Sequence, residues 1–191
     1  MRAVIATLSR HRRAAIKAET HPMAIAIRQA AYPEANVVAE TVRMSFRDVA
    51  EKFEITREAA PTHPSQCEAE WIQRDMDAGW VYLLAEEESK VIGCIAYKKT
   101  DSRTLEAQRL AVLPEHRGGA FANQLNNAVL EYAGKGGIAK ICISIVSQHS
   151  ALKRWYLRMG FSECETRQFE HLPFSVTYLE YELPRCDYDS D

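Results

Sequence analysis

The stretch from Leu110 to Ala122 limits what this 191-residue chain can fold into more than any other segment. It begins with an apolar run and reaches Pro114, which cannot donate to a sheet ladder, so a strand is expected to end there. From Arg117 to Ala122 nearly every side chain is small, and from Phe121 onward apolar residues recur at helical spacing. The segment therefore predicts a strand, a small-residue turn and the start of an amphipathic helix.

A turn of this kind is suited to bind phosphate. The first N–H groups of a helix lack intrahelical partners, and the helix dipole places partial positive charge there. Small residues let a pyrophosphate approach the backbone, and Arg117 adds a guanidinium that can pair with phosphate oxygens. The sequence lacks the Gly-x-x-x-x-Gly-Lys-Ser/Thr and Gly-x-Gly-x-x-Gly loops of nucleotide sites. The alternative is a strand-to-helix turn whose small residues only pack.

A second motif follows the first after a predicted helix and a predicted strand. It reads Trp155-Tyr156-Leu157-Arg158-Met159-Gly160-Phe161. A glycine at this position is typical of a helix end, and the phenylalanine after it begins the next predicted strand. Two motifs in this order are far more specific than either motif alone.

Together the two motifs resemble the acyl-CoA site of the GCN5-related N-acetyltransferases (GNAT). The family pattern Val-x-Pro-x-x-Arg-Gly-x-Gly/Ala-x-Gly/Ala matches residues 112–122, with Ala120 in place of the usual first glycine, and the second motif resembles the helix ending Phe-Tyr-x-x-x-Gly-Phe. The resemblance covers about Met23 to Leu183. It implies acetyl-CoA as the co-substrate, held by Leu110, Ala111, Val112, Arg117, Gly118, Gly119, Ala120, Phe121, Ala122 and His149.

The periodicity of the whole chain predicts an α/β (α+β) domain with the order β-α-α-β-β-β-α-β-α-β-β. Strands are expected at residues 24–28, 80–85, 90–97, 103–113, 139–146, 161–169 and 175–183, and helices at 34–53, up to Gly79, from Phe121 and at 149–159. The spacing of Ser65 and Glu68 is that of a capping box, which should start the second helix. The resemblance implies a twisted mixed sheet with helices on both faces, in which two strands splay apart.

Composition limits the classes of function and the location expected for the chain. It is 47% hydrophobic with a net charge of −2, which gives no general case for binding nucleic acid or a membrane. Five scattered cysteines fit a cytoplasmic location and show no metal-ligand spacing, so no metal is expected. The predicted parts are a basic N-terminal extension (1–22), a GNAT-like domain (23–184) and an acidic tail (185–191). The extension is interpreted as an appendage, with a transit peptide or a membrane-surface helix as alternatives.

The resemblance also implies catalytic roles. Tyr156 occupies the position of the general acid that protonates the departing thiolate, with a core tyrosine as the alternative. The backbone from Leu110 to Val112, with donors freed by a bulge, would polarise the acyl carbonyl. Glu106 is the only carboxylate on that strand and shares the face of Leu110 unless a bulge intervenes, so it is a candidate base or a solvated carboxylate.

Two histidines are candidates for binding. His149 stands where many relatives have an asparagine that touches the pantetheine, and the alternative is a helix-start histidine. His63, in a loop with Pro61 and Pro64, is a candidate for recognising the acceptor or deprotonating it, and the alternative is a rigid loop that caps the second helix.

These observations predict an acyl-CoA-dependent N-acyltransferase that transfers an acetyl group to a primary amine. Direct attack in a ternary complex is expected, because no cysteine stands at a nucleophile position. The acceptor is a small molecule or a peptide, and a homodimer is left open. The alternative is an acyl-CoA-binding sensor or regulatory domain without turnover.

Overall fold

The computed structural model describes residues 25–184, so the predicted extension (1–22) and tail (185–191) lie outside the described residues. Within them, one sheet is formed by β1 (Ala26–Gln29), β2 (Val81–Glu87), β3 (Lys90–Lys99), β4 (Thr104–Val112), β5 (Lys140–Val146), β6 (Ser162–Gln168) and β7 (Ser175–Glu182). The helices are α1 (Ala35–Lys52), α2 (Ala69–Asp77), α3 (Phe121–Lys135) and α4 (Ser150–Arg158). Short 3₁₀ turns form η1 (Tyr32–Glu34), η2 (Pro64–Gln66) and η3 (Pro114–His116).

The order of strands and helices is the predicted one, and the α/β (α+β) fold class is confirmed. The strands lie in the order β1-β2-β3-β4-β5-β7-β6, and only the β4–β5 pair of this described sheet is parallel. No helix in the described range is long and apolar enough to cross a bilayer.

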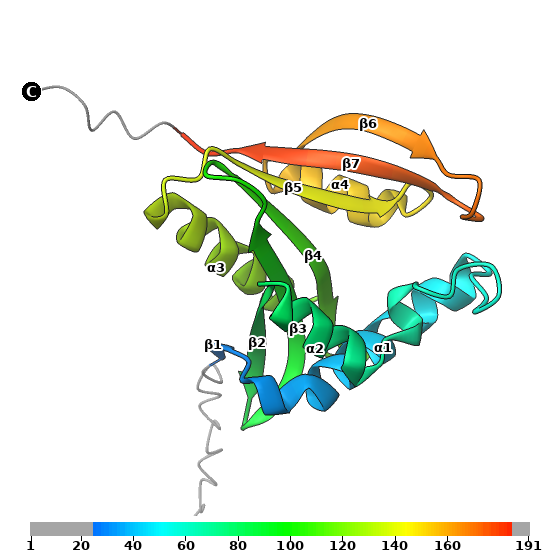
Figure 1. Ribbon diagram of the computed structural model, residues 1–191, viewed down its shortest axis with the longest axis horizontal. Helices are drawn as coiled ribbons and strands as arrows, with labels where there is room; N and C mark the ends of the chain where they lie inside the picture. The colour runs from blue at the N-terminus through cyan, green and yellow to red at the C-terminus, as the bar shows by residue number, and fades with distance from the viewer. Residues whose placement is uncertain (1–24, 185–191) are drawn as a thin grey trace, which may run out of the picture.

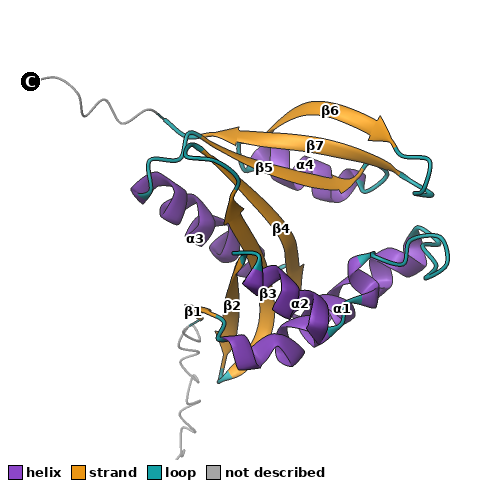
Figure 2. Ribbon diagram, in the orientation of Figure 1, coloured by secondary structure: helices purple, strands orange, loops and turns teal. Residues whose placement is uncertain are grey.

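Helices cover both faces of the sheet (Figures 1 and 2). Val38 and Val42 lie one helical turn apart on α1 and are fully buried in a cluster with Ile72 of α2 and apolar residues of β2 and β3. On the other face, α3 and α4 contribute Leu125 and Tyr156 to a second buried cluster. The apolar stripes that predict these helices are therefore the surfaces that they bury.

The sheet opens between β4 and β5 (Figure 1). These strands pair over three register positions only, the last of which joins Glu106 to Cys142. Both strands continue beyond this pair, to Val112 and Val146, while each stays paired on its other side with β3 or β7. The splayed strands that the GNAT resemblance implied are confirmed.

A β-bulge interrupts β4 where the strands separate. The register with β3 shifts between Cys94 and Ala96, so that Arg109 and Leu110 both stand opposite Ile95. Arg109 adopts a left-handed backbone with φ 51°. This conformation costs a non-glycine residue on the order of 1 kcal/mol and persists where the surroundings impose it.

The bulge reverses the alternation of side chains along β4. Ala107 and Val112 belong to the same buried cluster although their positions in the strand differ by an odd number. Glu106 and Gln108 therefore point to the opposite face from Leu110 and Val112. Glu106 was predicted to share the face of Leu110 unless a bulge intervened, and the bulge does intervene.

The second helix begins later than predicted. The first residue of α2 is Ala69, and no side chain caps the helix. The predicted capping box at Ser65 is therefore wrong. Ser65 lies in η2, where its backbone N–H and its hydroxyl both reach the ring of His63. The chain leaves the helical region at Cys67, which has φ −57° and ψ 130°, so the turn at Ser65 does not continue into α2.

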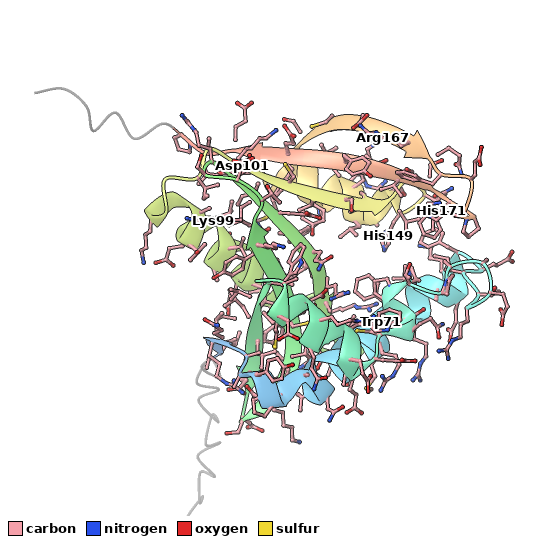
Figure 3. The ribbon with its side chains drawn as sticks, in the orientation of Figure 1. Trp71, Lys99, Asp101, His149, Arg167 and His171 are labelled. Carbon is pink, nitrogen blue, oxygen red and sulfur yellow. The ribbon has the colours of Figure 1, made fainter. Side chains whose placement is uncertain are left out.

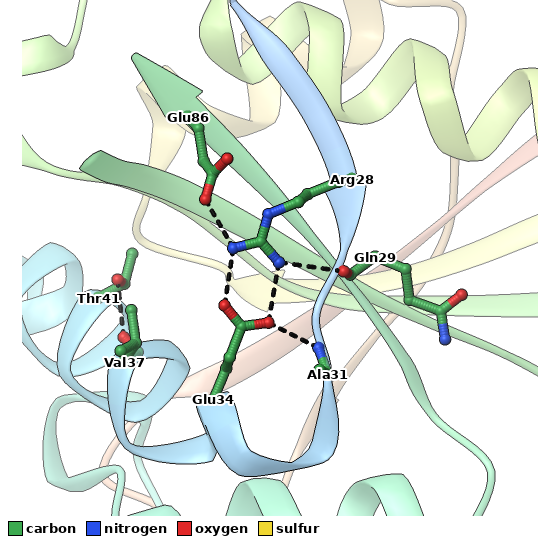
Figure 4. A network of polar contacts seen from close by, with 7 residues as sticks. All are labelled: Arg28, Gln29, Ala31, Glu34, Val37, Thr41 and Glu86. Atoms are coloured by element: carbon green, nitrogen blue, oxygen red, sulfur yellow. Dashed lines mark hydrogen bonds and ion pairs between the residues drawn. The ribbon is translucent and has the colours of Figure 1, made fainter. Parts of the chain in front are cut away.

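An ionic network fixes the start of α1 against the edge strand β1 (Figure 4). Arg28 donates to both carboxylate oxygens of Glu34, at 2.8 and 2.7 Å, and to Glu86 of β2 at 2.6 Å. The carboxylate of Glu34 also accepts the backbone N–H of Ala31 at 2.7 Å. The Arg28 guanidinium lowers the pKa of Glu34 to about 2. The network orients α1, which forms one wall of the cleft described next.

Candidate active site

A cavity of about 820 Å³ lies where β4 and β5 separate. Residues 107–112 of β4 and 143–146 of β5, the segments beyond the last shared register pair, line its sides. Its other walls come from α1, the β4–α3 turn, α4 and the loop between β6 and β7. This volume is in the range of small-molecule and cofactor sites.

The β4–α3 turn presents free backbone donors. In the described part of the chain, the N–H groups of Gly118, Gly119 and Ala120 have no acceptor, and neither do those of the first turn of α3 up to Asn123. Gly118 has φ 82°, which glycine adopts without strain. The turn and the positive end of the α3 dipole fit a diphosphate group.

The predicted cofactor residues divide into two groups. Those that line the cavity are Leu110, Ala111, Val112, Arg117, Gly118, Gly119, Ala122 and His149. Ala120 is exposed at the N-cap of α3 and Phe121 turns its ring toward His116, with ring centroids 5.9 Å apart, so neither side chain lines the cavity. Only their backbone N–H groups remain available to a ligand.

The side chain of Arg117 pairs with groups of α1 and β4. Its two terminal nitrogens donate to the carboxylate of Asp48 on α1, and one of them also donates to the carbonyl of Ser45. Its Nε donates to the carbonyl of Val112 at 3.1 Å. The Arg117 guanidinium lowers the pKa of Asp48. All three nitrogens tie the turn to α1 and β4, and the phosphate contact of Arg117 stays a prediction.

Tyr156 reaches the cavity from the core. Its ring is 5% exposed and packs against Trp155 and Phe161, with centroids 4.7 and 5.1 Å away. Its hydroxyl has no hydrogen-bond partner within the described residues and keeps accessible surface. Buried tyrosine hydroxyls usually have a partner, so this one is available to a ligand. Burial raises the pKa of Tyr156, so the phenol retains its proton.

Both predicted histidines line the cavity, and both act as helix N-caps. The Nδ1 atom of His63 accepts the backbone N–H of Ser65 at 3.3 Å, and that of His149 accepts the N–H of Leu152 at 3.2 Å. Burial lowers the pKa of His63 to about 4 and also lowers that of His149. A neutral ring that accepts at Nδ1 carries its proton on Nε2, so each histidine is a hydrogen-bond donor. Figure 3 shows His149 on the side of α4 that faces α1.

Glu106 is not brought to the cavity. It lies at the closed end of the opening, in register with Lys98 and Cys142 on the neighbouring strands. Gln108, one pleat further along the same face, is the β4 side chain that lines the cavity there. Among the residues described, no aspartate or glutamate lines this cavity, and no group of His, Cys, Asp or Glu is placed to hold a metal ion.

A sequence comparison with family models decides the family. The model described as the acetyltransferase (GNAT) family matches residues 45–161, which is more than half of the chain. The chain belongs to the GNAT acetyltransferase family. The match includes the β4–α3 turn and ends at Phe161, the last residue of the second motif.

Curated relatives of this GNAT chain are distant. An uncharacterized N-acetyltransferase of Mycobacterium tuberculosis (strain ATCC 25618 / H37Rv) is 26% identical over 87 residues. The match covers 46% of this chain and 56% of that protein, so the chain matches only about half the length of this relative. A protein of Mycobacterium bovis with the same description matches equally well.

Solved structures show the same fold. The PaiA N-acetyltransferase of Thermoplasma acidophilum, in complex with coenzyme A, gives a TM-score of 0.67 at 21% identity, over 84% of this chain and 100% of that one. YncA of Salmonella typhimurium, a putative acetyltransferase with acetyl-CoA, gives 0.63 at 19%, over 85% and 95%. The ribosomal-protein-alanine N-acetyltransferase of Brucella melitensis gives 0.61 at 19%, over 83% and 99%.

Several cavity residues of this GNAT chain were not predicted. Trp155 donates from its indole N–H to Asn123 at 3.0 Å and so joins α4 to α3 across the cavity wall. Ser45 of α1 is 3% exposed, and its hydroxyl has no partner among the described residues. Trp155 stands beside Tyr156 in the second motif, which could have indicated its place. Nothing in the local sequence distinguishes Asn123 or Ser45.

Arg109, which was also not predicted as a site residue, holds the β4 bulge in place through its side chain. Its guanidinium donates to the carboxylate of Asp75 on α2 and to the hydroxyl of Tyr82 on β2. Burial lowers the pKa of Arg109. The ion pair with Asp75 compensates the buried charge of Arg109 and fixes the left-handed backbone of β4 at the cavity wall.

Proposed function

We propose that this chain transfers an acyl group, most simply acetyl, from acyl-CoA to a primary amine by direct attack in a ternary complex. The β4–α3 turn binds the diphosphate through its free N–H groups. The pantetheine arm and the acyl group lie between β4 and β5, beside the bulge.

The observation that carries this proposal is the free hydroxyl of Tyr156. It is a protonated donor in the cavity that also contains the N–H groups of Gly118 and Gly119. A sensor that only holds acyl-CoA has no need of a proton donor there. None of the four cysteines in the described range lines the cavity, which favours direct attack over a covalent intermediate on the protein.

The bond changes of the proposed transfer balance without an oxidant or a metal. The amine nitrogen bonds to the acyl carbon, and the carbon–sulfur bond breaks. The sulfur takes the proton of Tyr156, and a proton leaves the nitrogen to water. Solvent then reprotonates Tyr156. The predicted roles change at one point, because water replaces Glu106 as the first proton acceptor.

One observation favours the second candidate, a non-catalytic acyl-CoA sensor. No carboxylate of the described residues lines the cavity, and both histidines present protonated nitrogens, so no side chain is poised to remove a proton from the amine. The sensor would bind acetyl-CoA and leave every amine unchanged.

A coupled binding and turnover experiment separates these functions. Acetyl-CoA binding is measured by calorimetry, and release of free coenzyme A is followed over a panel of primary amines, with a blank that lacks amine. We expect binding together with amine-dependent release and a mass increase of one acetyl group on the amine. Binding without amine-dependent release would support the sensor, and absence of binding would contradict both.

A further inference from the structure

One end of the cavity, between α1 and the β6–β7 loop, is apolar. Its walls come from α1, from the loop before η2 and from the loop between β6 and β7, through Phe46, Val49, Ala60, Leu172 and Phe174. Ala60, Leu172 and Phe174 also belong to a small apolar cluster that joins the end of α1 to the β6–β7 loop. An acceptor held here would bury apolar surface against both walls.

His63 offers a ring N–H beside these apolar side chains. The ring of His63 lies between the rings of Phe46 and Phe174, edge-on to each, with centroids 6.0 and 6.3 Å away. Its Nδ1 is occupied by Ser65, and its Nε2 has no partner within the described chain and is not sealed from solvent. His63 is therefore a neutral N–H donor, suited to a carbonyl oxygen.

No charged group at this end could recognise a cationic acceptor. Arg109 and Arg117 are the charged side chains among the described lining residues, and each is paired with an aspartate. A second ammonium group, as in a polyamine, would lose its hydration here without gaining a partner.

The lack of a base also selects among amines. The amine must be neutral to attack, and an α-amino group has an ordinary pKa of about 7.7–8.0 against about 10.4 for a lysine side chain. At pH 7.5 about a third of the α-amino groups are neutral, but only about 0.1% of the lysine amines are.

From these features we infer that the acceptor is an α-aminoacyl group with an apolar side chain. The side chain packs on the apolar wall that contains Phe46 and Phe174, and the carbonyl next to the amine accepts the Nε2–H of His63. The inference rests on the proposed function and names its substrate class. An amino-acid amide and the first residue of a peptide share this chemistry.

The test measures kcat/KM for acetyl transfer at pH 7.5 with matched amines. L-phenylalaninamide and a tetrapeptide amide that begins with phenylalanine represent the two sources. Phenethylamine keeps the ring and the amine but lacks the carbonyl, and Nα-acetyl-lysinamide and spermidine represent basic amines. We expect at least about a tenfold advantage for the phenylalanine compounds over the basic amines. Preference between the amide and the peptide then identifies the source.

The His63→Phe variant tests the carbonyl contact, because it keeps an aromatic ring and removes the donor. The KM for phenylalaninamide should rise about fivefold, as for loss of one neutral hydrogen bond, while the KM for phenethylamine and for acetyl-CoA stays unchanged. Equal effects on both amines would overturn the role of His63. Better use of spermidine or the lysine compound would overturn the inference while leaving the proposed function intact. Failure to bind acetyl-CoA would instead contradict the proposed function.

Discussion

The phenol of Tyr156 carries a proton throughout the neutral pH range, because burial raises its pKa. Replacing it by phenylalanine keeps the packing against Trp155 and Phe161 and removes only the hydroxyl. Loss of a general acid costs about 10²–10⁴-fold in rate, and a thiolate leaves readily, so we expect kcat to fall roughly tenfold to a few hundredfold. The KM for acetyl-CoA should change little. Steady-state kinetics and a melting curve on one preparation decide: unchanged kcat with a shifted melting temperature would identify a core residue.

His63 should also make stability depend on pH. Its folded-state pKa of about 4 lies below the ordinary value of 6.5, so the unfolded chain binds a proton first as pH falls. The contribution of the neutral ring is complete above pH 6.5 and declines as pH falls toward 4, by roughly 3 kcal/mol in all. Denaturant unfolding at pH 7 and 4.5 should show a larger loss for the wild type than for His63→Phe. Identical losses in the two proteins would mean that His63 is not the group responsible.

At the scale of elements, the contact with α1 positions the β4–α3 turn, which we propose binds the diphosphate. Arg117 is bound by Asp48, which is 51% exposed in its side chain, so the ion pair itself adds little stability. Its effect should appear in ligand binding. We expect Asp48→Ala to weaken acetyl-CoA binding roughly threefold to tenfold, because the turn loses its anchor. If Arg117 instead bound phosphate directly, the same change would free its charge and strengthen acetyl-CoA binding. The two roles of Arg117 therefore predict opposite changes in affinity, which calorimetry of the variant measures.

The elements themselves were predictable from the sequence, because each depends on local patterns. Alternating and helical spacing gave the order of strands and helices, and the glycines and prolines gave their ends. The bulge at Arg109 was not predictable in position, since it depends on Asp75 and Tyr82, which come from other elements. The partner of Arg117 was missed for the same reason, because Asp48 lies 69 residues earlier in the chain.

In the candidate site, too, the features that depend on local sequence were predictable and those that depend on distant residues were not. The small residues of the turn and Tyr156 were identified through motifs in which neighbouring positions constrain one another. Glu106 was chosen as a base because it is the only carboxylate on its strand and was expected to share the face of Leu110, and the structure places Gln108 rather than Glu106 on the cavity wall. The direction of a carboxylate along a strand depends on every irregularity before it, and one bulge changes the face that later residues share.

At the scale of the whole molecule, the fold brings a helix N-terminus and a proton donor to one opening between two strands. Acetyl-CoA binding at the β4–α3 turn is the claim on which every other role depends. Ala120, the exposed N-cap of α3, allows it to be tested with little risk to the fold, because aspartate and asparagine are both favourable at that position. The two variants differ only in charge.

Calorimetric titration of acetyl-CoA into the wild type, Ala120→Asp and Ala120→Asn tests this claim most directly. The account predicts one site per chain in the wild type and an affinity for Ala120→Asp at least about tenfold below that for Ala120→Asn, because the added carboxylate repels the diphosphate. Equal affinities for the two variants, or no binding by the wild type, would contradict it.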